Sequence, residues 1–157
     1  MAALFVMLAA CGPRPDMASQ PFRNPDAPIY SSAVLEPDRM AGRWVQVAGF
    51  GNGALTCGPG EVIIADGEIR WSLCLDQPQN GTGALVPGKQ GRFGVADMQD
   101  WWVLWVDGDY RTMVIGTPSG QFGFVLNREA TLPADRARAV GDIFDFNGYD
   151  PGALQVF

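Results

Sequence analysis

The sequence of 157 residues contains no histidine, and this absence excludes several kinds of site. Histidine is the usual ligand of haem and of catalytic zinc, and it is the usual general base near neutral pH. Charged residues make up only 18% of the chain, and the net charge of −6 is the opposite of the basic surplus that nucleic-acid binding requires. We therefore predict no cofactor, no metal site and no nucleic-acid partner.

The apolar run at the N-terminus, residues 1–11, is too short to span a bilayer and is typical of the apolar region of a secretory signal. Leu8-Ala9-Ala10-Cys11 has the spacing of a bacterial lipobox, after which the cysteine becomes the lipidated N-terminus. Because Gly12 follows rather than aspartate, we expect anchoring in the outer membrane, facing the periplasm. No Lys or Arg precedes the run, so a start codon further upstream, an uncleaved anchor or a buried segment with an inert Cys11 stays open.

The rest of the chain divides into a tether and one domain. Residues 12–39 are rich in proline and polar side chains, which is typical of a semi-extended tether that holds a domain off the bilayer. Residues 40–157 are long enough for one domain with a sizeable core. The high counts of glycine (20) and proline (12) favour many short strands separated by turns.

Hydrophobic patterning predicts a mostly β domain with one helix. A two-residue Asp66-Gly67 turn between two alternating runs is a strong hairpin signal, and pairing outward from it sets Ile64 opposite Ile69. That register places five side chains on one inward face: Val62, Ile64, Ile69, Trp71 and Leu73. We expect strands over 44–50, 61–65, 68–75, 84–86 (short and irregular), 91–95, 101–106, 111–116, 121–128 and 154–157, with the helix over 133–146.

Two cysteines remain if Cys11 carries lipid. The hairpin register places Cys57 and Cys74 close together on the outer face, and an exported protein lies where disulfides persist. We predict a Cys57–Cys74 disulfide, and closing so short a loop adds roughly 3 kcal/mol of stability. A reactive thiol is the alternative.

The stretch that organises the domain is Gly42-Arg43-Trp44, at the start of the first strand. Glycine lets another segment approach closely, while an indole fills a large volume and keeps one N–H to donate. Arg128 ends an otherwise apolar strand face, where a cation needs a partner, and an indole face is one such partner. We predict that Arg128 packs on Trp44 at the floor of a barrel. A core tryptophan and an ordinary solvated strand end are the alternatives.

Three blocks resemble the lipocalin family, and in particular the bacterial lipoprotein lipocalins. Gly42-Arg43-Trp44 is similar to the first block, Asp107-Gly108-Asp109-Tyr110 to the turn of the second, and Asn127-Arg128 to the third. The resemblance covers about residues 40–157 and implies an all-β fold. That fold is an eight-stranded antiparallel up-and-down barrel, with one C-terminal helix packed outside and a short final strand. The segment from Trp44 to Tyr110 is shorter than the family pattern, so we expect the strands over 84–86 and 91–95 to be truncated.

The same resemblance implies that the inward faces of the strands line a ligand pocket. The residues expected to line it are Val62, Ile64, Trp71, Leu73, Phe93, Val103, Trp105, Val114 and Phe124. Trp102, Leu104, Met113 and Ile115 are expected to face outward, toward the helix. A barrel filled by its own side chains is the alternative, because small barrels often have no free interior.

We therefore expect a membrane-anchored binding protein and no enzyme. Its ligand would be a small hydrophobic molecule, with a fatty acid or a lysophospholipid implied by the resemblance, for storage or transport of lipid in the cell envelope. Carboxylates pair only in turns, and the sequence has no phosphate-binding glycine loop and no nucleophilic serine elbow. The alternative function is contact with another protein, as a peptidase inhibitor or an envelope assembly factor. The sequence gives no oligomeric state.

Overall fold

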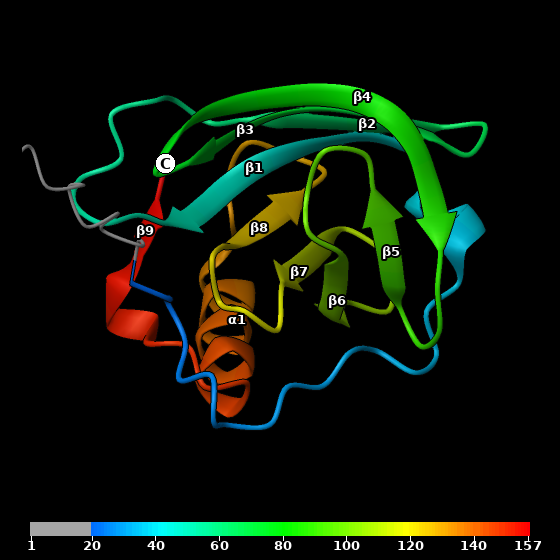
Figure 1. Ribbon diagram of the computed structural model, residues 1–157. Helices are drawn as coiled ribbons and strands as arrows, with labels where there is room; N and C mark the ends of the chain where they lie inside the picture. Colours follow the sequence, from blue (N-terminus) through cyan, green and yellow to red (C-terminus); the bar gives the residue numbers. More distant parts are fainter. Residues whose placement is uncertain (1–19) are drawn as a thin grey trace, which may run out of the picture.

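The computed structural model describes residues 20–157, so Cys11 and the first part of the expected tether lie outside the described residues. Eight antiparallel strands form a closed barrel, because β1 pairs with both β2 and β8, and β9 adds to the edge of β1 (Figure 1). The strands are β1 (Gly42–Phe50), β2 (Glu61–Ala65), β3 (Glu68–Leu75), β4 (Gln77–Pro87), β5 (Arg92–Val95), β6 (Trp101–Val106), β7 (Thr112–Gly116), β8 (Gly123–Asn127) and β9 (Leu154–Val156). The predicted barrel and final strand are confirmed.

Helices flank the barrel. The α-helix α1 (Ala134–Phe146) packs outside the barrel, as predicted, where it covers β7 and β8, and two short 3₁₀ helices, η1 (Pro37–Met40) and η2 (Pro151–Ala153), precede β1 and β9 (Figure 1). Within residues 20–157, the search for a helix long and apolar enough to cross a membrane found none.

Burial separates two apolar clusters, one on each side of the barrel wall. The inner cluster contains Met40, Trp44, Val62, Ile64, Ile69, Trp71, Leu73, Leu75, Leu85, Phe93, Val95, Trp101, Val103, Tyr110, Met113, Ile115, Phe122, Phe124 and Leu126. The outer cluster, beneath α1, contains Val45, Val47, Ala48, Phe50, Leu104, Val114, Val125, Val140, Phe144 and Tyr149. β8, which is buried along its whole length, contributes to both clusters because successive side chains of a strand point to opposite faces.

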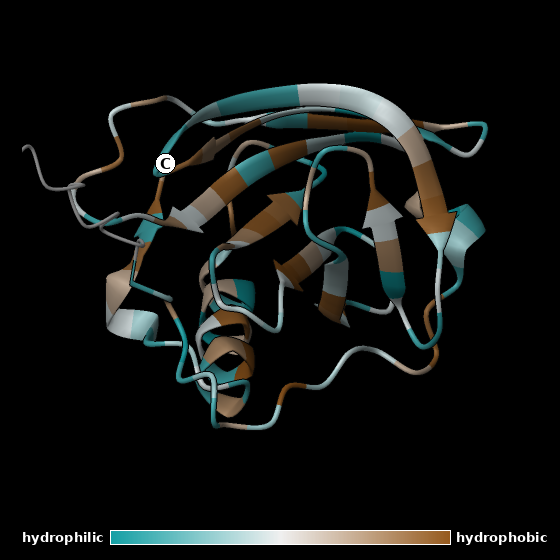
Figure 2. Ribbon diagram, viewed as in Figure 1, coloured by the Kyte–Doolittle hydropathy of each residue, from teal (hydrophilic) through white to brown (hydrophobic). Residues whose placement is uncertain are grey.

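The strand β4 is longer than predicted. Residues 77–84 of β4 pair with the whole of β3, from Glu68 opposite Ala84 to Leu75 opposite Gln77, and Leu85–Pro87 pair with β5. Its first seven residues are glycine, proline, threonine and amide-bearing residues, which give no hydrophobic alternation by which the strand could be predicted. Figure 2 shows β4 as hydrophilic or neutral over most of its length and hydrophobic only near its end.

Much of the expected tether is packed on the barrel. Residues 20–36 run from beside β9, past the end of α1, to η1 (Figure 1). Arg23 is 4% exposed, and its guanidinium donates to the carbonyl oxygens of Asn147 (3.0 Å), Pro118 (2.7 Å) and Ala27 (2.5 Å). Because these carbonyls come from segments far apart in the sequence, Arg23 fixes the strap formed by residues 20–36 to the fold.

The predicted disulfide is present. Cys57 and Cys74, which are 17 positions apart in the sequence, are bonded, with their Cα atoms 5.6 Å apart. The bridge joins the loop before β2 to the end of β3, and the predicted hairpin register, with Ile64 opposite Ile69, is also confirmed.

Candidate functional site

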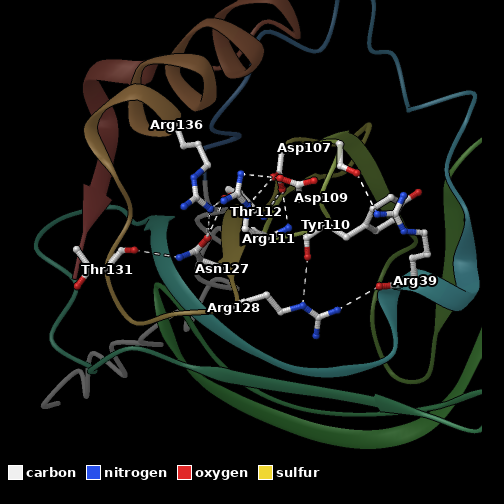
Figure 3. A network of polar contacts seen from close by, with 11 residues as sticks. Arg39, Asp107, Asp109, Tyr110, Arg111, Thr112, Asn127, Arg128, Thr131 and Arg136 are labelled. Atoms are coloured by element: carbon white, nitrogen blue, oxygen red, sulfur yellow. Dashed lines mark hydrogen bonds and ion pairs between the residues drawn. The ribbon is translucent and has the colours of Figure 1, made fainter.

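The two ends of the barrel differ, and the floor is closed by the predicted tryptophan and arginine. Trp44 is fully buried, and its indole N–H donates to the Met40 carbonyl oxygen at 2.8 Å. The guanidinium carbon of Arg128 lies 3.6 Å from the centre of the Trp44 ring. The guanidinium also donates to the carbonyl oxygens of Arg39 (3.1 Å) and Tyr110 (3.2 Å) (Figure 3). Two further carbonyl oxygens, of Ala41 (2.9 Å) and Arg43 (3.0 Å), accept hydrogen bonds from the same group.

This geometry explains the glycine of the first block. Gly42 has a φ of +105°, a backbone conformation that disfavours side chains, and a Cβ on it would lie 3.0 Å from an Arg128 nitrogen. The close approach that the sequence predicted at this glycine is therefore made by the arginine of the third block. Burial lowers the pKa of Arg128, but a guanidinium remains protonated at any physiological pH.

The second block folds as a turn that supports the same floor. Asp107 accepts hydrogen bonds at 2.6 Å from the backbone N–H groups of both Arg111 and Thr112 (Figure 3). Tyr110 adopts a φ of +54°, and its hydroxyl accepts a hydrogen bond from the Glu36 N–H at 2.7 Å. The turn thus connects β6 and β7 to the chain that enters η1, and all three sequence blocks meet at one end of the barrel.

Asp107 makes the stability of the floor depend on pH. Partial burial acts to raise its pKa, but the Thr112 and Arg111 N–H groups and the Arg111 guanidinium outweigh burial, so its pKa is lowered below the ordinary 3.8. A lowered folded-state pKa contributes stability that is complete above the ordinary pKa and is lost as the pH falls through the folded-state pKa. We therefore expect Asp107→Asn to lower the unfolding midpoint at neutral pH, with the difference from the native chain shrinking below about pH 4.

Thermal unfolding measured from pH 7 to pH 2 checks this expectation. Asp109→Asn is the matched control, because Asp109 is 72% exposed and only forms an ion pair with Arg111. A gap between native chain and Asp107→Asn that stays constant down to pH 2 would contradict the assignment.

The interior above the floor is filled by side chains. Seven of the nine predicted pocket residues belong to the inner cluster: Val62, Ile64, Trp71, Leu73, Phe93, Val103 and Phe124. Trp101 and Phe124, which sequence reasoning did not pair, pack edge to face with ring centres 5.0 Å apart. The ligand-binding role of the seven stays a prediction, since buried core side chains occupy these positions.

Trp105 and Val114 lie on the other side of the wall, against the outer cluster, so their predicted inward orientation is wrong. For Trp105 the cause is an irregularity in β6, where the register with β7 shifts between Val103 and Trp105, because one extra residue in a strand reverses the faces that follow it. In β7 the faces follow from regular pairing with β8, which sets Val114 opposite Val125 outside and Ile115 opposite Phe124 inside. Met113 and Ile115, expected outside, therefore lie in the inner cluster, whereas Leu104 lies outside as predicted.

Two polar atoms of the inner cluster have no partner in the described part of the chain. These are the indole Nε1 atoms of Trp71 and Trp101, on side chains that are 4% and 1% exposed. A buried donor without an acceptor costs about 1–3 kcal/mol, and indole nitrogen only donates. The interior therefore offers two donors that an acceptor atom of a ligand or a water molecule would satisfy.

The open end of the barrel carries a hollow of about 370 Å³, which is the candidate binding site. It is lined by Phe22, Asn52, Leu75, Asp76, Gln77, Gln79, Asp97, Met98, Gln99, Gln121 and Phe122. Three of them, Leu75, Met98 and Phe122, pack with the inner cluster and form an apolar base, while amides and carboxylates form the rim. Sequence reasoning missed this site because its lining comes from loops, from the polar start of β4 and from the strap.

No comparison with curated proteins gave a match. A family model described as a lipocalin-like domain matches residues 91–157, which include the Asp107 turn, Arg128 and α1. The solved structures that resemble this fold include a major allergen of cockroaches, Per a 4, with 11% identity, a TM-score of 0.58 and coverage of 85% of this chain and 94% of the allergen. Another is the siderocalin Ex-FABP, with 13% identity, a TM-score of 0.54 and coverage of 76% and 93%.

Residues 91–157 therefore match the lipocalin-like domain family, and the similar solved structures support the same barrel fold. Members of this family generally bind ligands rather than catalyse reactions. The first block lies outside the matched segment, yet the centre of the Trp44 ring lies 3.6 Å from the guanidinium carbon of Arg128 in the matched segment, so the structure joins the two parts into one floor. Within residues 20–157, the search for groups of three or more residues that could hold a metal ion found none.

Proposed function

We propose that this lipocalin binds a single-chain lipid, such as a fatty acid or a lysophospholipid, at the open end of its barrel. The observation that carries the proposal is the hollow of about 370 Å³ with an apolar base and a polar rim. Ligand pockets in proteins span about 300–1,000 Å³ and combine an apolar lining with a few polar groups. An amphiphile fits this division, because its chain contacts the base while its head meets the rim.

The aromatic side chains beneath the hollow mark the path that a lipid chain would take. Trp101 packs edge-on against Phe124, whose ring centre lies 5.8 Å from that of Phe122 at the base of the hollow. A lipid chain that enters beneath the base would separate these rings, while its polar head stays at the rim. The interior side chains would have to move for the chain of a lipid to enter, so we expect the hollow to deepen on binding.

Membrane anchoring through lipidated Cys11 and a role in lipid storage or transport in the cell envelope are parts of this proposal. They are supported by the lipobox Leu8-Ala9-Ala10-Cys11. Several acyl chains, each contributing about 0.8 kcal/mol per buried CH₂, would hold the chain firmly on a bilayer. The residues concerned lie outside the described part of the chain.

Ligand extraction and fluorescence titration test the proposal together. Solvent extraction of the purified chain, followed by mass spectrometry, is expected to yield a single-chain lipid. Titration of the delipidated chain with fatty acids and lysophospholipids is expected to change the tryptophan emission. The reason is that Trp101 packs on Phe124, which in turn packs on Phe122 at the base of the hollow. An empty extract with unchanged emission would contradict lipid binding, and a copurifying protein without lipid would favour contact with another protein instead.

A further inference from the structure

The rim of the hollow has an unusual charge composition for a site that would take a fatty acid. Five of its lining residues are amides and two, Asp76 and Asp97, are carboxylates, while none of the lining residues is Lys or Arg. In the described part of the chain, neither carboxylate forms an ion pair with a basic side chain. A carboxylate headgroup at this rim would meet two like charges and no compensating cation.

From this composition we infer that the hollow selects an uncharged, hydroxyl-bearing headgroup, such as that of a monoacylglycerol, and disfavours an ionised fatty acid. The inference rests on the proposed function, whose ligand it narrows. A hydroxyl both donates and accepts, and a side-chain amide does the same, so rim amides such as Gln77 and Gln79 can pair with a hydroxyl in either sense. A carboxylate only accepts, so Asp76 and Asp97 add acceptors for hydroxyl hydrogens and repulsion for anions.

The positions of the two carboxylates support this preference. Asp76 directly follows β3 at the rim, where its carboxylate accepts hydrogen bonds from the backbone N–H (2.8 Å) and the side-chain amide (3.3 Å) of Asn52. Asp97 lies in the loop between β5 and β6, beside Met98 of the apolar base. Both groups therefore stand between the apolar base and solvent, where the polar end of a bound amphiphile must lie.

The first test compares two probes that share one acyl chain, a monoacylglycerol and the corresponding fatty acid at pH 8. We expect the monoacylglycerol to bind the native full-length chain about five-fold more tightly at low ionic strength, equivalent to about 1 kcal/mol of repulsion between close charges in water. High salt should strengthen fatty-acid binding and leave monoacylglycerol binding unchanged, because screening acts only on the charged pair. Calorimetric titration at both salt concentrations measures this.

The second test removes the charges without changing shape. Asp97→Asn is expected to narrow the gap between the two probes, and the double variant Asp76→Asn/Asp97→Asn to abolish most of it, with monoacylglycerol affinity within about two-fold of the native value. Asp66→Asn is the matched control, because Asp66 lies in the β2–β3 turn at the floor end and, like Asp76 and Asp97, has a positive φ that asparagine tolerates. This control should leave both affinities unchanged.

The outcomes separate the inference from the proposed function. Equal or tighter binding of the fatty acid by the native chain would overturn the headgroup selection while leaving lipid binding intact. Tighter binding of the matching alkylamine than of the monoacylglycerol would also overturn it, because the carboxylates would then select a cation. Binding of none of the three probes would contradict the proposed function itself.

Discussion

Trp44→Ala is expected to lower the free energy of unfolding by about 3–5 kcal/mol, the loss typical of a large buried aromatic side chain. Trp44 is fully buried at the floor, so its removal leaves a cavity that the barrel cannot easily close. It also removes the ring on which the Arg128 guanidinium lies at 3.6 Å and the donor to the Met40 carbonyl oxygen. A cation on an indole face contributes about 0.5–2 kcal/mol by itself.

Urea denaturation followed by circular dichroism measures this loss. Trp105→Ala is the control, because Trp105 is only partly buried against the outer cluster and is expected to lose distinctly less stability. Trp44→Phe should fall between the two, since it keeps a ring under Arg128 but loses the hydrogen bond to Met40. A loss below about 1 kcal/mol for Trp44→Ala would mean that the floor does not depend on the indole.

The floor could be predicted from the sequence because a few residues with strict physical requirements specify it. An arginine on an apolar strand face needs a partner, an indole supplies one, and only a glycine allows the guanidinium to approach as Arg128 approaches Gly42. The inward face of the β2–β3 hairpin was equally predictable, because a two-residue turn leaves one register for Ile64 and Ile69.

The parts that could not be predicted depend on backbone irregularity or on packing between distant segments. Alternation alone cannot reveal the shift in β6 that turns Trp105 outward, and it does not say which face of β7 is inward, which depends on pairing with β8. The strap was expected to be a tether, because proline-rich composition gives no sign of the three carbonyl oxygens that hold Arg23. The candidate hollow was missed for a related reason, since Phe22 of the strap and Gln77 of β4 meet only in the folded chain.

Gln46 is a further residue whose burial hydrophobic periodicity does not predict, and its replacement is expected to cause the second large loss of stability. Its side chain is fully buried and joins β1 to β3: its amide nitrogen donates to the Cys74 carbonyl oxygen at 2.9 Å, and its oxygen accepts from the Cys74 N–H at 2.8 Å. Gln46→Leu keeps the approximate volume but leaves both backbone groups of Cys74 buried without a partner. Each such group costs about 1–3 kcal/mol, so we expect a loss of about 2–5 kcal/mol.

Gln155 offers a matched control for this prediction, because it makes the same pair of bonds in a more exposed place. Its oxygen accepts from the Leu55 N–H at 2.8 Å and its nitrogen donates to the Gly53 carbonyl oxygen at 2.7 Å, but water can replace it there. Gln155→Leu is therefore expected to lose no more than about 1 kcal/mol in the same urea experiment. Equal losses for the two variants would mean that the Cys74 backbone groups find new partners when Gln46 is replaced. Burial would then not explain the contribution of Gln46 to the free energy of unfolding.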